Sequence, residues 1–294
     1  MPDPTCMSHW LPKLETAGLP VPRTILVPMP RWAYADVFNV FDGKPLEGPA
    51  NAFLRELAAV ATEIGYPAFL RTGMTSGKHS WSKTCYLTDP ARLLEHVANL
   101  VEFSECVSFV GLSCEWWAVR ELLPTMPLAV CPRYEGMPVC REFRCFVADG
   151  EVRCMHPYWP PEALERGGVT DPERIAAQLA SCPDEPAVRA LAARAGAAVG
   201  GEWSVDVLET ERGWFVTDMA EAGKSWHWPG CAVTVAECRD RPTIPQLPLQ
   251  RGAPVARTGT ARSSGDRWLQ RECSSLWHDS QSVVPFEISK RSSG

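Results

Sequence analysis

Two segments in the second half of the chain alternate apolar and polar residues on either side of a turn, and they constrain the fold more than any other feature. In the first segment, 139–156, the turn residues are Asp149 and Gly150, a pair that is typical of a two-residue β-hairpin loop. In the second segment, 203–219, the turn ends in Gly213, as expected of a three-residue loop. We therefore predict two antiparallel hairpins.

The other elements follow from the spacing of apolar residues and from glycine and proline signals. A chain of 294 residues is long enough for one large domain or two closely packed lobes. Predicted helices span 7–18, 51–64, 90–103, 172–181 and 185–199, and further strands span 24–27, 68–71, 84–87 and 116–123.

The second hairpin predicts two facing carboxylates. With a three-residue loop, Thr210 pairs with Trp214, and Asp206 then lies opposite Asp218 on the same face. Cβ atoms in such a pair are about 4.5–5.5 Å apart, and like charges at that separation are destabilising. A divalent cation would remove the repulsion, and carboxylate oxygens suit Mg²⁺, with Glu221 as a third candidate ligand. The alternative is that an aspartate pairs with an arginine or faces water.

A loop rich in glycine and hydroxyl residues, 72–82, separates the strands at 68–71 and 84–87. Its backbone N–H groups could approach phosphate oxygens, and Lys78 or Lys83 could supply positive charge. A strand follows this loop, whereas a helix follows a phosphate-binding P-loop, so it is not a loop of that class. A flexible surface loop is the alternative interpretation.

The first hairpin predicts a basic face. If Ala148 pairs with Glu151 across the turn, then Arg144 and Arg153 are diagonal neighbours on one face. Two adjacent guanidinium groups favour binding of an anion such as a polyphosphate. In the alternative interpretation, Glu142 and Glu151 neutralise the two arginines.

The twelve cysteines are dispersed through the chain and no two of them have C-x-x-C spacing. We therefore expect reduced thiols that pack as small apolar side chains, among them Cys140, Cys145 and Cys154 in strand-like segments. The six histidines show no ligand spacing either, and His156 is expected to be structural. The sequence thus gives little support for a zinc site or a redox motif.

No stretch approaches about 18 uncharged apolar residues, and the N-terminus has no basic region followed by an apolar run, so we expect a cytoplasmic protein without a membrane segment. Residues 239–294 have no apolar periodicity, and we predict a disordered tail there. The tail holds nine Lys/Arg and five Asp/Glu, and the rest of the chain holds 20 and 30. An acidic body argues against broad non-specific binding of nucleic acid.

The order of these segments resembles the ATP-grasp superfamily. The resemblance covers about residues 10–230. A strand that ends in a basic residue, a glycine-rich loop, a basic hairpin and a hairpin with carboxylates follow one another as they do in that superfamily. More narrowly, four motifs resemble a bacterial and phage clade related to proposed ATP-grasp RNA ligases, and one segment resembles the eukaryotic cell-division-cycle protein that assembles a translation initiation factor. The motifs are Phe69-Leu-Arg-Thr-Gly73, Thr75-Ser-Gly-Lys78, Arg141-Glu-Phe-Arg144 and Trp203-Ser-Val-Asp206, and the segment is Glu142-Phe-Arg-Cys-Phe-Val147.

This resemblance implies an α+β ATP-grasp fold in which two α+β lobes hold the nucleotide between them. The ATP-grasp domain would occupy 1–238, followed by the tail at 239–294. Within it we expect an N-terminal lobe at about 1–65, a lobe with the nucleotide loop at 66–125, and a C-terminal lobe with the metal carboxylates at 126–238.

The resemblance also implies that ATP and Mg²⁺ are the cofactors. A phosphate would meet Arg71 and a loop lysine, for which Lys78 matches better than Lys83, and Arg144 would reach the γ-phosphate. Arg71 stands where many ATP-grasp enzymes have lysine, and the asparagine usual near the second metal carboxylate is absent. Adenine would meet Glu121 and the backbone of Leu122 and Leu123. The candidate catalytic residues are Lys78 and Arg144, the other nucleotide-binding candidates are Arg71, Lys83, Glu121, Leu122, Leu123, Arg141 and Arg153, and the metal candidates are Asp206, Asp218 and Glu221.

The activity implied by the resemblance is ATP-dependent ligation of a carboxylate to an amine or another nucleophile through an acyl-phosphate. One alternative is an enzyme that joins or repairs RNA ends. Another is a non-catalytic ATP-binding assembly factor with a protein partner. The acceptor pockets of this fold are built from variable loops, so the sequence does not identify the substrate.

Overall fold

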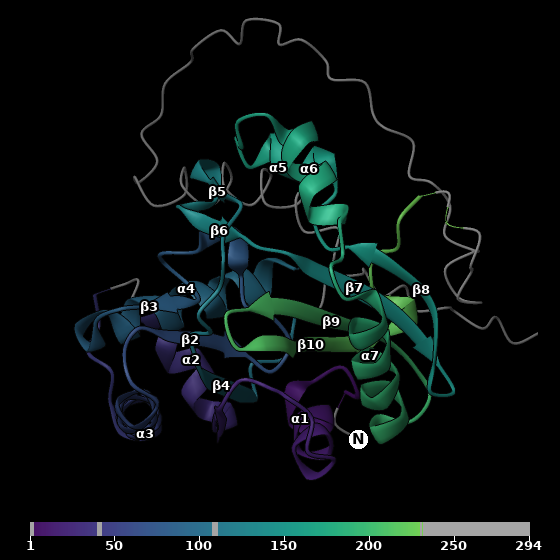
Figure 1. Ribbon diagram of the computed structural model, residues 1–294. Coiled ribbons are helices and arrows are strands. Elements are labelled where there is room, and N and C mark those ends of the chain that lie inside the picture. Colours follow the sequence, from purple (N-terminus) through teal and green to yellow (C-terminus); the bar gives the residue numbers. More distant parts are fainter. Residues whose placement is uncertain (1–2, 40–42, 108–110, 230, 232–294) are drawn as a thin grey trace, which may run out of the picture.

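The structure is a computed structural model that describes residues 3–39, 43–107, 111–229 and 231, and the tail predicted at 239–294 lies outside these ranges. The described chain forms two four-stranded antiparallel sheets and a two-stranded ribbon, together with the helices that pack on them (Figure 1). No helix within these ranges has the length and hydropathy that crossing a membrane requires.

The first sheet has the strand order β1-β4-β2-β3. Because side chains alternate along a strand, Leu70 and Trp117 point into a core formed with helices α2, α3 and α4. Arg71 and Arg120 take the alternate positions, on the opposite face. The elements of this lobe are β1 (Thr24–Pro28), α2 (Arg31–Phe38), α3 (Gly48–Ile64), β2 (Ala68–Thr72), the 3₁₀ turns η2 (Lys78–Ser80) and η3 (Pro90–Arg92), β3 (Tyr86–Leu87), α4 (Leu93–Cys106) and β4 (Trp116–Glu121).

The second sheet has the order β10-β9-β7-β8, and helices α1 and α7 cover one of its faces. Phe143, Cys145 and Val205 pack into the core beneath these helices. Arg144 and Asp206 occupy the alternate positions of these strands and belong to the uncovered face. The alternation predicted for the first hairpin also separates Arg144 from Phe143 and Cys145. The elements are α1 (Met7–Thr16), β7 (Glu142–Ala148), β8 (Glu151–Pro157), α7 (Glu185–Val199), β9 (Glu202–Thr210), β10 (Gly213–Glu221) and the 3₁₀ turn η5 (Ala222–Lys224).

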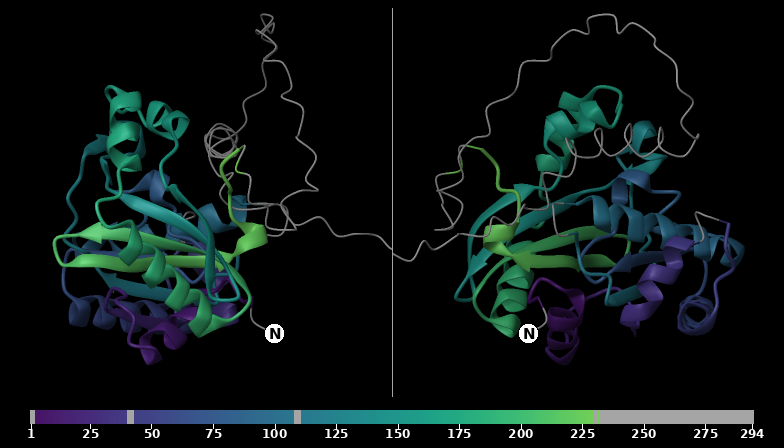
Figure 2. Two further views of the ribbon diagram at one scale, coloured as in Figure 1. Left: turned by 45° about the vertical axis from the view of Figure 1, so that its right-hand side comes forward. Right: turned by 180° about the vertical axis from the view of Figure 1, so that it is seen from behind.

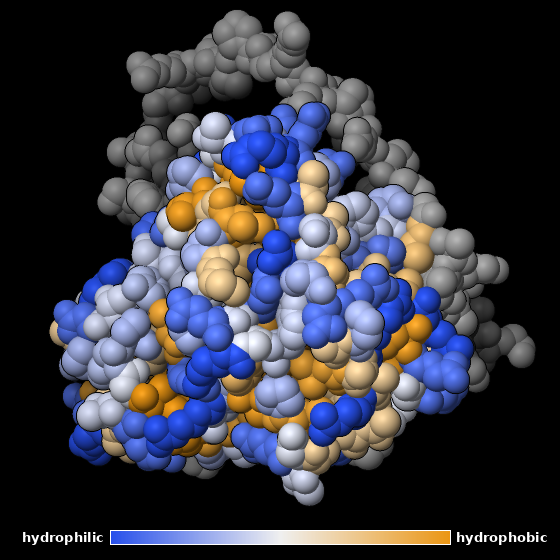
Figure 3. Space-filling model, in the orientation of Figure 1, coloured by the Kyte–Doolittle hydropathy of each residue, from blue (hydrophilic) through white to orange (hydrophobic). Residues whose placement is uncertain are grey.

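A smaller unit projects beyond the two sheets, as the views from different sides agree (Figure 2). Its own core contains Met137, Trp159 and Leu164. Hydrophobic residues gather over this unit in Figure 3. Val130 of its ribbon is 50% exposed, and Met126, which precedes the ribbon in sequence, is 45% exposed. The unit consists of β5 (Ala129–Cys131), η4 (Pro132–Tyr134), β6 (Met137–Val139), α5 (Pro161–Arg166) and α6 (Pro172–Ala180).

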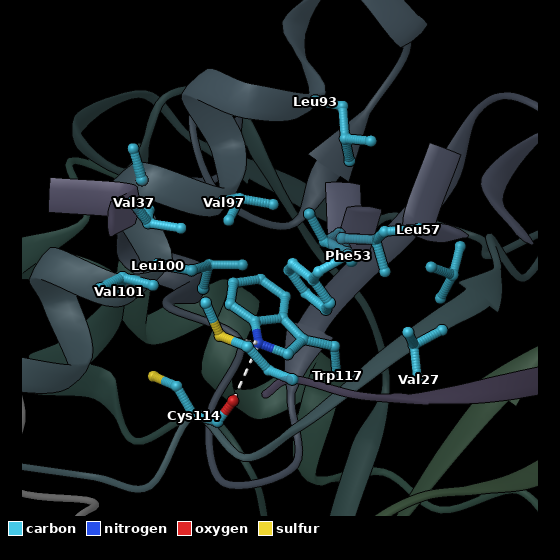
Figure 4. Packing of buried hydrophobic residues seen from close by; sticks show 14 of the residues in the cluster. Val27, Val37, Phe53, Leu57, Leu93, Val97, Leu100, Val101, Cys114 and Trp117 are labelled. Atoms are coloured by element: carbon cyan, nitrogen blue, oxygen red, sulfur yellow. Dashed lines mark hydrogen bonds between the residues drawn. The ribbon is translucent and has the colours of Figure 1, made fainter. Parts of the chain in front are cut away.

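The core of the first lobe is centred on Trp117 of β4. Its ring is fully buried and meets the ring of Phe53 edge-on, with 5.8 Å between the centroids (Figure 4). The indole N–H donates to the carbonyl oxygen of Cys114 over 3.0 Å, so the one polar atom of the side chain is satisfied inside the core. This packing holds β4 in place, and with it Arg120 on the opposite face.

The lobe boundaries differ from the predicted ones. Strand β1 pairs with β4, so the segments 1–65 and 66–125 share one sheet and one core instead of forming two lobes. Helix α1 packs beneath the second sheet, although it belongs to the N-terminal segment. Both differences arise because strand pairing and helix packing join segments that are distant in sequence, whereas the prediction divides the chain into consecutive segments.

The second hairpin confirms that Asp206 and Asp218 are partners across β9 and β10, but by a different route from the predicted one. The loop has two residues, because Thr210 pairs with Gly213 and not with Trp214. A β-bulge at Thr217 then restores the register by inserting one extra residue into β10. Two errors in the prediction therefore cancel.

The predicted register of the first hairpin is wrong. Ala148 does pair with Glu151, but a register shift between Phe146 and Val147 leaves Arg153 without a partner position, and Arg144 lies opposite His156. Arg144 and Arg153 are therefore not diagonal neighbours. A bulge of this kind is a feature of backbone geometry that side-chain alternation does not reveal.

Helix α7 approaches β7 closely at Gly196. A Cβ atom built there would lie 2.5 Å from Val147 Cγ1. Alanine is the better helix former by about 1 kcal/mol, but overpacking a core costs about 1–3 kcal/mol. We expect Gly196→Ala to lower the free energy of unfolding by about 1 kcal/mol in a urea titration. The loss should shrink in a Val147→Ala background, and an equal loss in both backgrounds would contradict this packing explanation.

Candidate functional site

A cavity of ≈ 380 Å³ lies between the uncovered faces of the two sheets. Its lining combines apolar and aromatic side chains with charged ones. This places side chains from both lobes around a single space, because each sheet has one face covered by helices and turns its other face toward the cavity. The apolar lining includes Phe69, Trp81, Tyr86, Leu123, Met137, Trp159 and Leu208, and the charged lining includes Arg71, Lys78, Arg120, Glu142 and Asp218.

Each of the two facing aspartates forms an ion pair with an arginine. Asp206 accepts from Arg144 Nε over 2.8 Å and from Arg144 Nη2 over 2.9 Å, which is a bidentate pair. Asp218 Oδ2 lies 3.0 Å from Arg71 Nη1, and the Arg71 side chain is only 4% exposed. Burial alone would raise the pKa of Asp218, but the charge of Arg71 and its hydrogen bond hold that pKa below the usual value. The arginine alternative is therefore the one observed.

Glu142 adds a third carboxylate to this group of charged side chains. Its Oε2 lies 3.8 Å from Lys78 Nζ, and its Oε1 accepts a hydrogen bond from Thr217 Oγ1 over 3.0 Å. Burial raises the pKa of Glu142, against the opposing effect of Lys78. Burial would lower the pKa of Lys78, but Glu142 and the other carboxylates raise it above its ordinary value, so the ammonium group stays charged.

The bulge residue Thr217 connects the two lobes. Its carbonyl oxygen accepts a hydrogen bond from Arg120 Nη1 over 2.7 Å, while its hydroxyl donates to Glu142. Among the described residues, none accepts a hydrogen bond from the buried Nη2 of Arg120. Burial, followed by the repulsion of Arg71, lowers the pKa of Arg120 to about 9. A buried donor without a partner, on the wall of a cavity, is suited to an anionic ligand.

The ring of Tyr158 contacts one cationic side chain from each lobe, Lys78 and Arg144. Its ring centroid lies 4.5 Å from Lys78 Nζ and 4.8 Å from Arg144 Cζ. Both separations fall within the range of cation–π attraction. Arg144 therefore adjoins the cavity through Tyr158, which contacts Lys78, and Asp206 adjoins it through Arg144. Neither Arg144 nor Asp206 belongs to the described lining itself.

Three backbone donors of the glycine-rich loop form hydrogen bonds within the loop itself. The hydroxyl of Thr72 accepts hydrogen bonds from the N–H groups of Met74 and Thr75, and the hydroxyl of Thr75 accepts one from Gly77 N. These donors are therefore already used inside the loop. The loop leads directly into η2, which begins with Lys78 and so carries its ammonium group to the cavity.

The segment that follows β4 lies at the cavity with Leu122 and Leu123. The carboxylate of Glu121 is engaged elsewhere: it accepts from Arg23 N over 2.8 Å and from Arg212 Nη2 over 2.9 Å. The N–H of Glu121 also donates to Arg23 O over 2.9 Å, so the predicted contact with a base rests on the backbone of Leu122 and Leu123.

Four candidates from the sequence do not line the cavity in the described structure. Glu221 is three residues from Asp218, and an odd spacing along a strand places side chains on opposite faces. Lys83 and Arg153 are about half exposed. The four candidates form ion pairs elsewhere, namely Lys83 with Glu135, Arg141 with Glu209, Arg153 with Glu151 and Glu221 with Lys224.

The structure also corrects the expectation that no cysteines and histidines are arranged as metal ligands. Cys154, His156, His227 and Cys231 offer ligand atoms that all lie within 4.8 Å of one another. The signal in the sequence is a C-x-H motif at 154–156 and an H-x₃-C motif at 227–231. Between these motifs lie 70 residues, and neither motif has C-x-x-C spacing. The sequence likewise does not reveal Thr217 and Tyr158 as site residues, and it places Arg120 only in the hinge stretch Arg120–Pro124 that the resemblance implies.

Comparison with known proteins gives one family. The sequence model of the ATP-grasp domain, family 3 of the clade designated R(2)K, matches residues 61–236 of this chain. No curated protein matches the chain.

Several solved structures have a similar fold. C-terminally truncated Cdc123 from Schizosaccharomyces pombe has 14% sequence identity and a TM-score of 0.48, over 83% of this chain and 93% of that chain. A RimK-domain ATP-grasp protein from Sphaerobacter thermophilus has 16% identity and a TM-score of 0.40, over 74% of this chain and 58% of that chain. D-alanine–D-alanine ligase from Bacillus anthracis has 12% identity and a TM-score of 0.36, over 73% and 53%. The present chain thus spans less than two thirds of the latter two proteins.

Proposed function

Because this chain belongs to family 3 of the R(2)K clade of ATP-grasp domains and has their α+β fold, we propose that it is an ATP- and Mg²⁺-dependent ligase. In the reaction class that we propose, a substrate carboxylate takes a phosphoryl group from ATP, and an amine or another nucleophile then displaces phosphate from the acyl-phosphate. The observation that carries the proposal is the meeting of the carboxylates of Glu142, Asp206 and Asp218 with Arg71, Lys78 and Arg120 beside a cavity that apolar and aromatic side chains also line.

The residues fit ATP and Mg²⁺. Asp206, Asp218 and Glu142 would supply hard oxygen ligands to Mg²⁺, with Glu142 in the place that was expected for Glu221. The unpartnered Nη2 of Arg120 and the ammonium group of Lys78 would bind phosphate oxygens. The apolar and aromatic part of the lining, together with the backbone at Leu122 and Leu123, would accept the base.

The ion pairs suggest how the site keeps its charge balanced. On nucleotide binding, Arg71 and Arg144 would leave Asp218 and Asp206 for phosphate oxygens, while the two carboxylates turn to the metal. Mg²⁺ supplies neutralisation of charge on the transferring phosphoryl group. The protein would contribute buried cations, which act more strongly there than they do in bulk solvent.

A second candidate function is non-catalytic ATP binding by an assembly factor. The buried bidentate pair of Arg144 and Asp206 favours it, because a pair that persisted with nucleotide bound would leave Asp206 unable to hold Mg²⁺. RNA-end ligation would be supported by a basic face shared by Arg144 and Arg153. The two arginines are not neighbours, and Arg153 pairs with Glu151.

We expect millimolar ATP with Mg²⁺ to raise the melting temperature of the full chain. A ligand at 100 times its dissociation constant stabilises a folded protein by about 2.7 kcal/mol if it binds only the folded state. The measurement is a thermal melt with ATP plus Mg²⁺, with ATP plus chelator and with Mg²⁺ alone. A folded protein whose melting temperature does not respond to ATP plus Mg²⁺ would contradict nucleotide binding.

Product analysis separates the reaction classes. The protein is incubated with ATP, Mg²⁺ and a panel of carboxylates, amines and RNA ends. ADP that depends on a carboxylate supports the proposed ligase, and AMP indicates adenylate chemistry, as in RNA-end joining. Neither product, together with a melting shift, supports the non-catalytic function.

A further inference from the structure

Cys154 and His156 present two soft ligands on one face of β8. Residues two apart on a strand point to the same side. Cys154 is buried, and within the described chain no group forms a hydrogen bond with the buried Nε2 of His156. A buried imidazole nitrogen without a partner needs an explanation, and a bound metal ion is one.

The segment after η5 brings two further ligands to the same place. Trp228 holds this segment against β8, because its indole N–H donates to Pro157 O over 2.9 Å and its ring stacks on His156 at 5.9 Å and 18°. His227 meets the ring of Phe146 edge-on with 4.4 Å between centroids. Cys231 lies four residues beyond His227, and its sulfur completes the cluster.

The distances are close to those of a tetrahedral zinc site. The four ligand atoms lie within 4.8 Å of one another, and Cys154 Sγ is 3.0 Å from His227 Nε2. Zinc bonds of about 2.3 Å to sulfur and 2.0–2.1 Å to nitrogen place tetrahedral ligands about 3.3–3.8 Å apart. The widest separation would therefore have to shorten by about 1 Å, and Cys154 Sγ and His227 Nε2 would have to move apart by about half an ångström. We propose that Cys154, His156, His227 and Cys231 bind a structural Zn²⁺ ion.

The chemistry of the ligands selects zinc. Two thiolates and two imidazoles suit a borderline-soft ion and not Mg²⁺, which takes oxygen ligands. Four protein ligands fill a tetrahedral shell, so the ion has no open position for catalysis. The two cysteines lose their protons on binding.

The position of the site gives the ion a role in the architecture. The ligands come from β8 and from the segment that follows η5, so the ion would clip that segment to the outer strand of the second sheet. His156 is the cross-strand partner of Arg144. The clip would therefore support the strand pair that carries Arg144, without touching the nucleotide cavity.

The test is metal analysis of the full chain after dialysis against metal-free buffer. We expect about one zinc ion per chain. Replacing that zinc with Co²⁺ should give the visible absorption of tetrahedral cobalt, together with near-ultraviolet thiolate charge-transfer bands. Cys231→Ala and His227→Ala should lose the zinc, whereas Cys182→Ala, a cysteine outside the cluster, should keep it. A strong chelator should lower the melting temperature of the wild-type chain and of Cys182→Ala, but not that of Cys231→Ala.

Results from the wild-type chain alone can overturn the proposal. It fails if purified protein holds no zinc and takes up none in a zinc titration. It also fails if mass spectrometry of freshly purified, unreduced protein shows Cys154 and Cys231 joined by a disulfide. Cys231→His covers the case in which alanine variants do not fold, because it should retain cobalt absorption with weaker thiolate bands. Full retention of zinc by His227→Ala would likewise exclude this ligand set.

Discussion

Asp206→Asn is expected to lower the free energy of unfolding of the metal-free protein by about 3–5 kcal/mol. The carboxylate of Asp206 is 5% exposed, and its bidentate partner Arg144 is 13% exposed. Removal of the negative charge leaves the guanidinium group buried without a counterion, which costs far more than the loss of a surface ion pair. The measurement is a urea titration in the presence of a chelator.

An ion pair of the same sheet provides the control. Glu151→Gln removes the partner of Arg153, but Glu151 is 72% exposed, so a change of less than about 1 kcal/mol is expected. An Asp206→Asn protein that is as stable as the wild type, or more stable, would mean that Asp206 and Asp218 repel each other in the metal-free state. The facing carboxylates would then need a cation and not an arginine.

Lys78→Met is expected to reduce ATP-dependent turnover at least about 100-fold, while Lys83→Met leaves it unchanged. Removal of a preorganised group that stabilises transition-state charge typically costs about 10²–10³ in rate. Lys78 lines the cavity beside Glu142 and Tyr158, whereas Lys83 pairs with Glu135 outside its lining. The two variants remove the same charge from positions five residues apart, so the comparison isolates location.

The readout is the rate of ADP formation with whichever carboxylate gives turnover. A melt with ATP and Mg²⁺ serves as a second readout, and it applies even if no substrate is found: Lys83→Met should keep the shift, and Lys78→Met should lose most of it. Equal behaviour of the two variants would contradict the assignment of Lys78 to the phosphates. Loss of activity in Lys83→Met alone would reassign the contact to Lys83.

Local patterns determined much of the fold. The predicted helix at 185–199 coincides with α7, and the one at 172–181 agrees with α6 to within one residue. The alternation along β7 assigned Phe143 and Arg144 to opposite faces correctly. These features depend on backbone geometry with a period of 3.6 or 2 residues, which the order of residues alone specifies.

The sequence patterns did not reveal which charged side chains form ion pairs with one another. Asp206 is paired with Arg144 from β7, and Asp218 with Arg71 from the other lobe. The bulge at Thr217 brings Glu142 and Arg120 to one residue, and it arises from a one-residue mismatch between two strands. Such partners depend on how the sheets meet, because an ion pair needs a separation of a few ångströms regardless of distance along the chain.

The cluster of Cys154, His156, His227 and Cys231 likewise depends partly on local sequence and partly on the tertiary structure. The sequence by itself determined that Cys154 and His156 share a face of a strand, since residues two apart always do. Only the tertiary structure placed His227 Nε2 3.0 Å from Cys154 Sγ, although the two residues are 73 positions apart in the sequence. The first relation is a property of the extended backbone, whereas the second exists only because η5 returns the chain to the outer strand of the sheet.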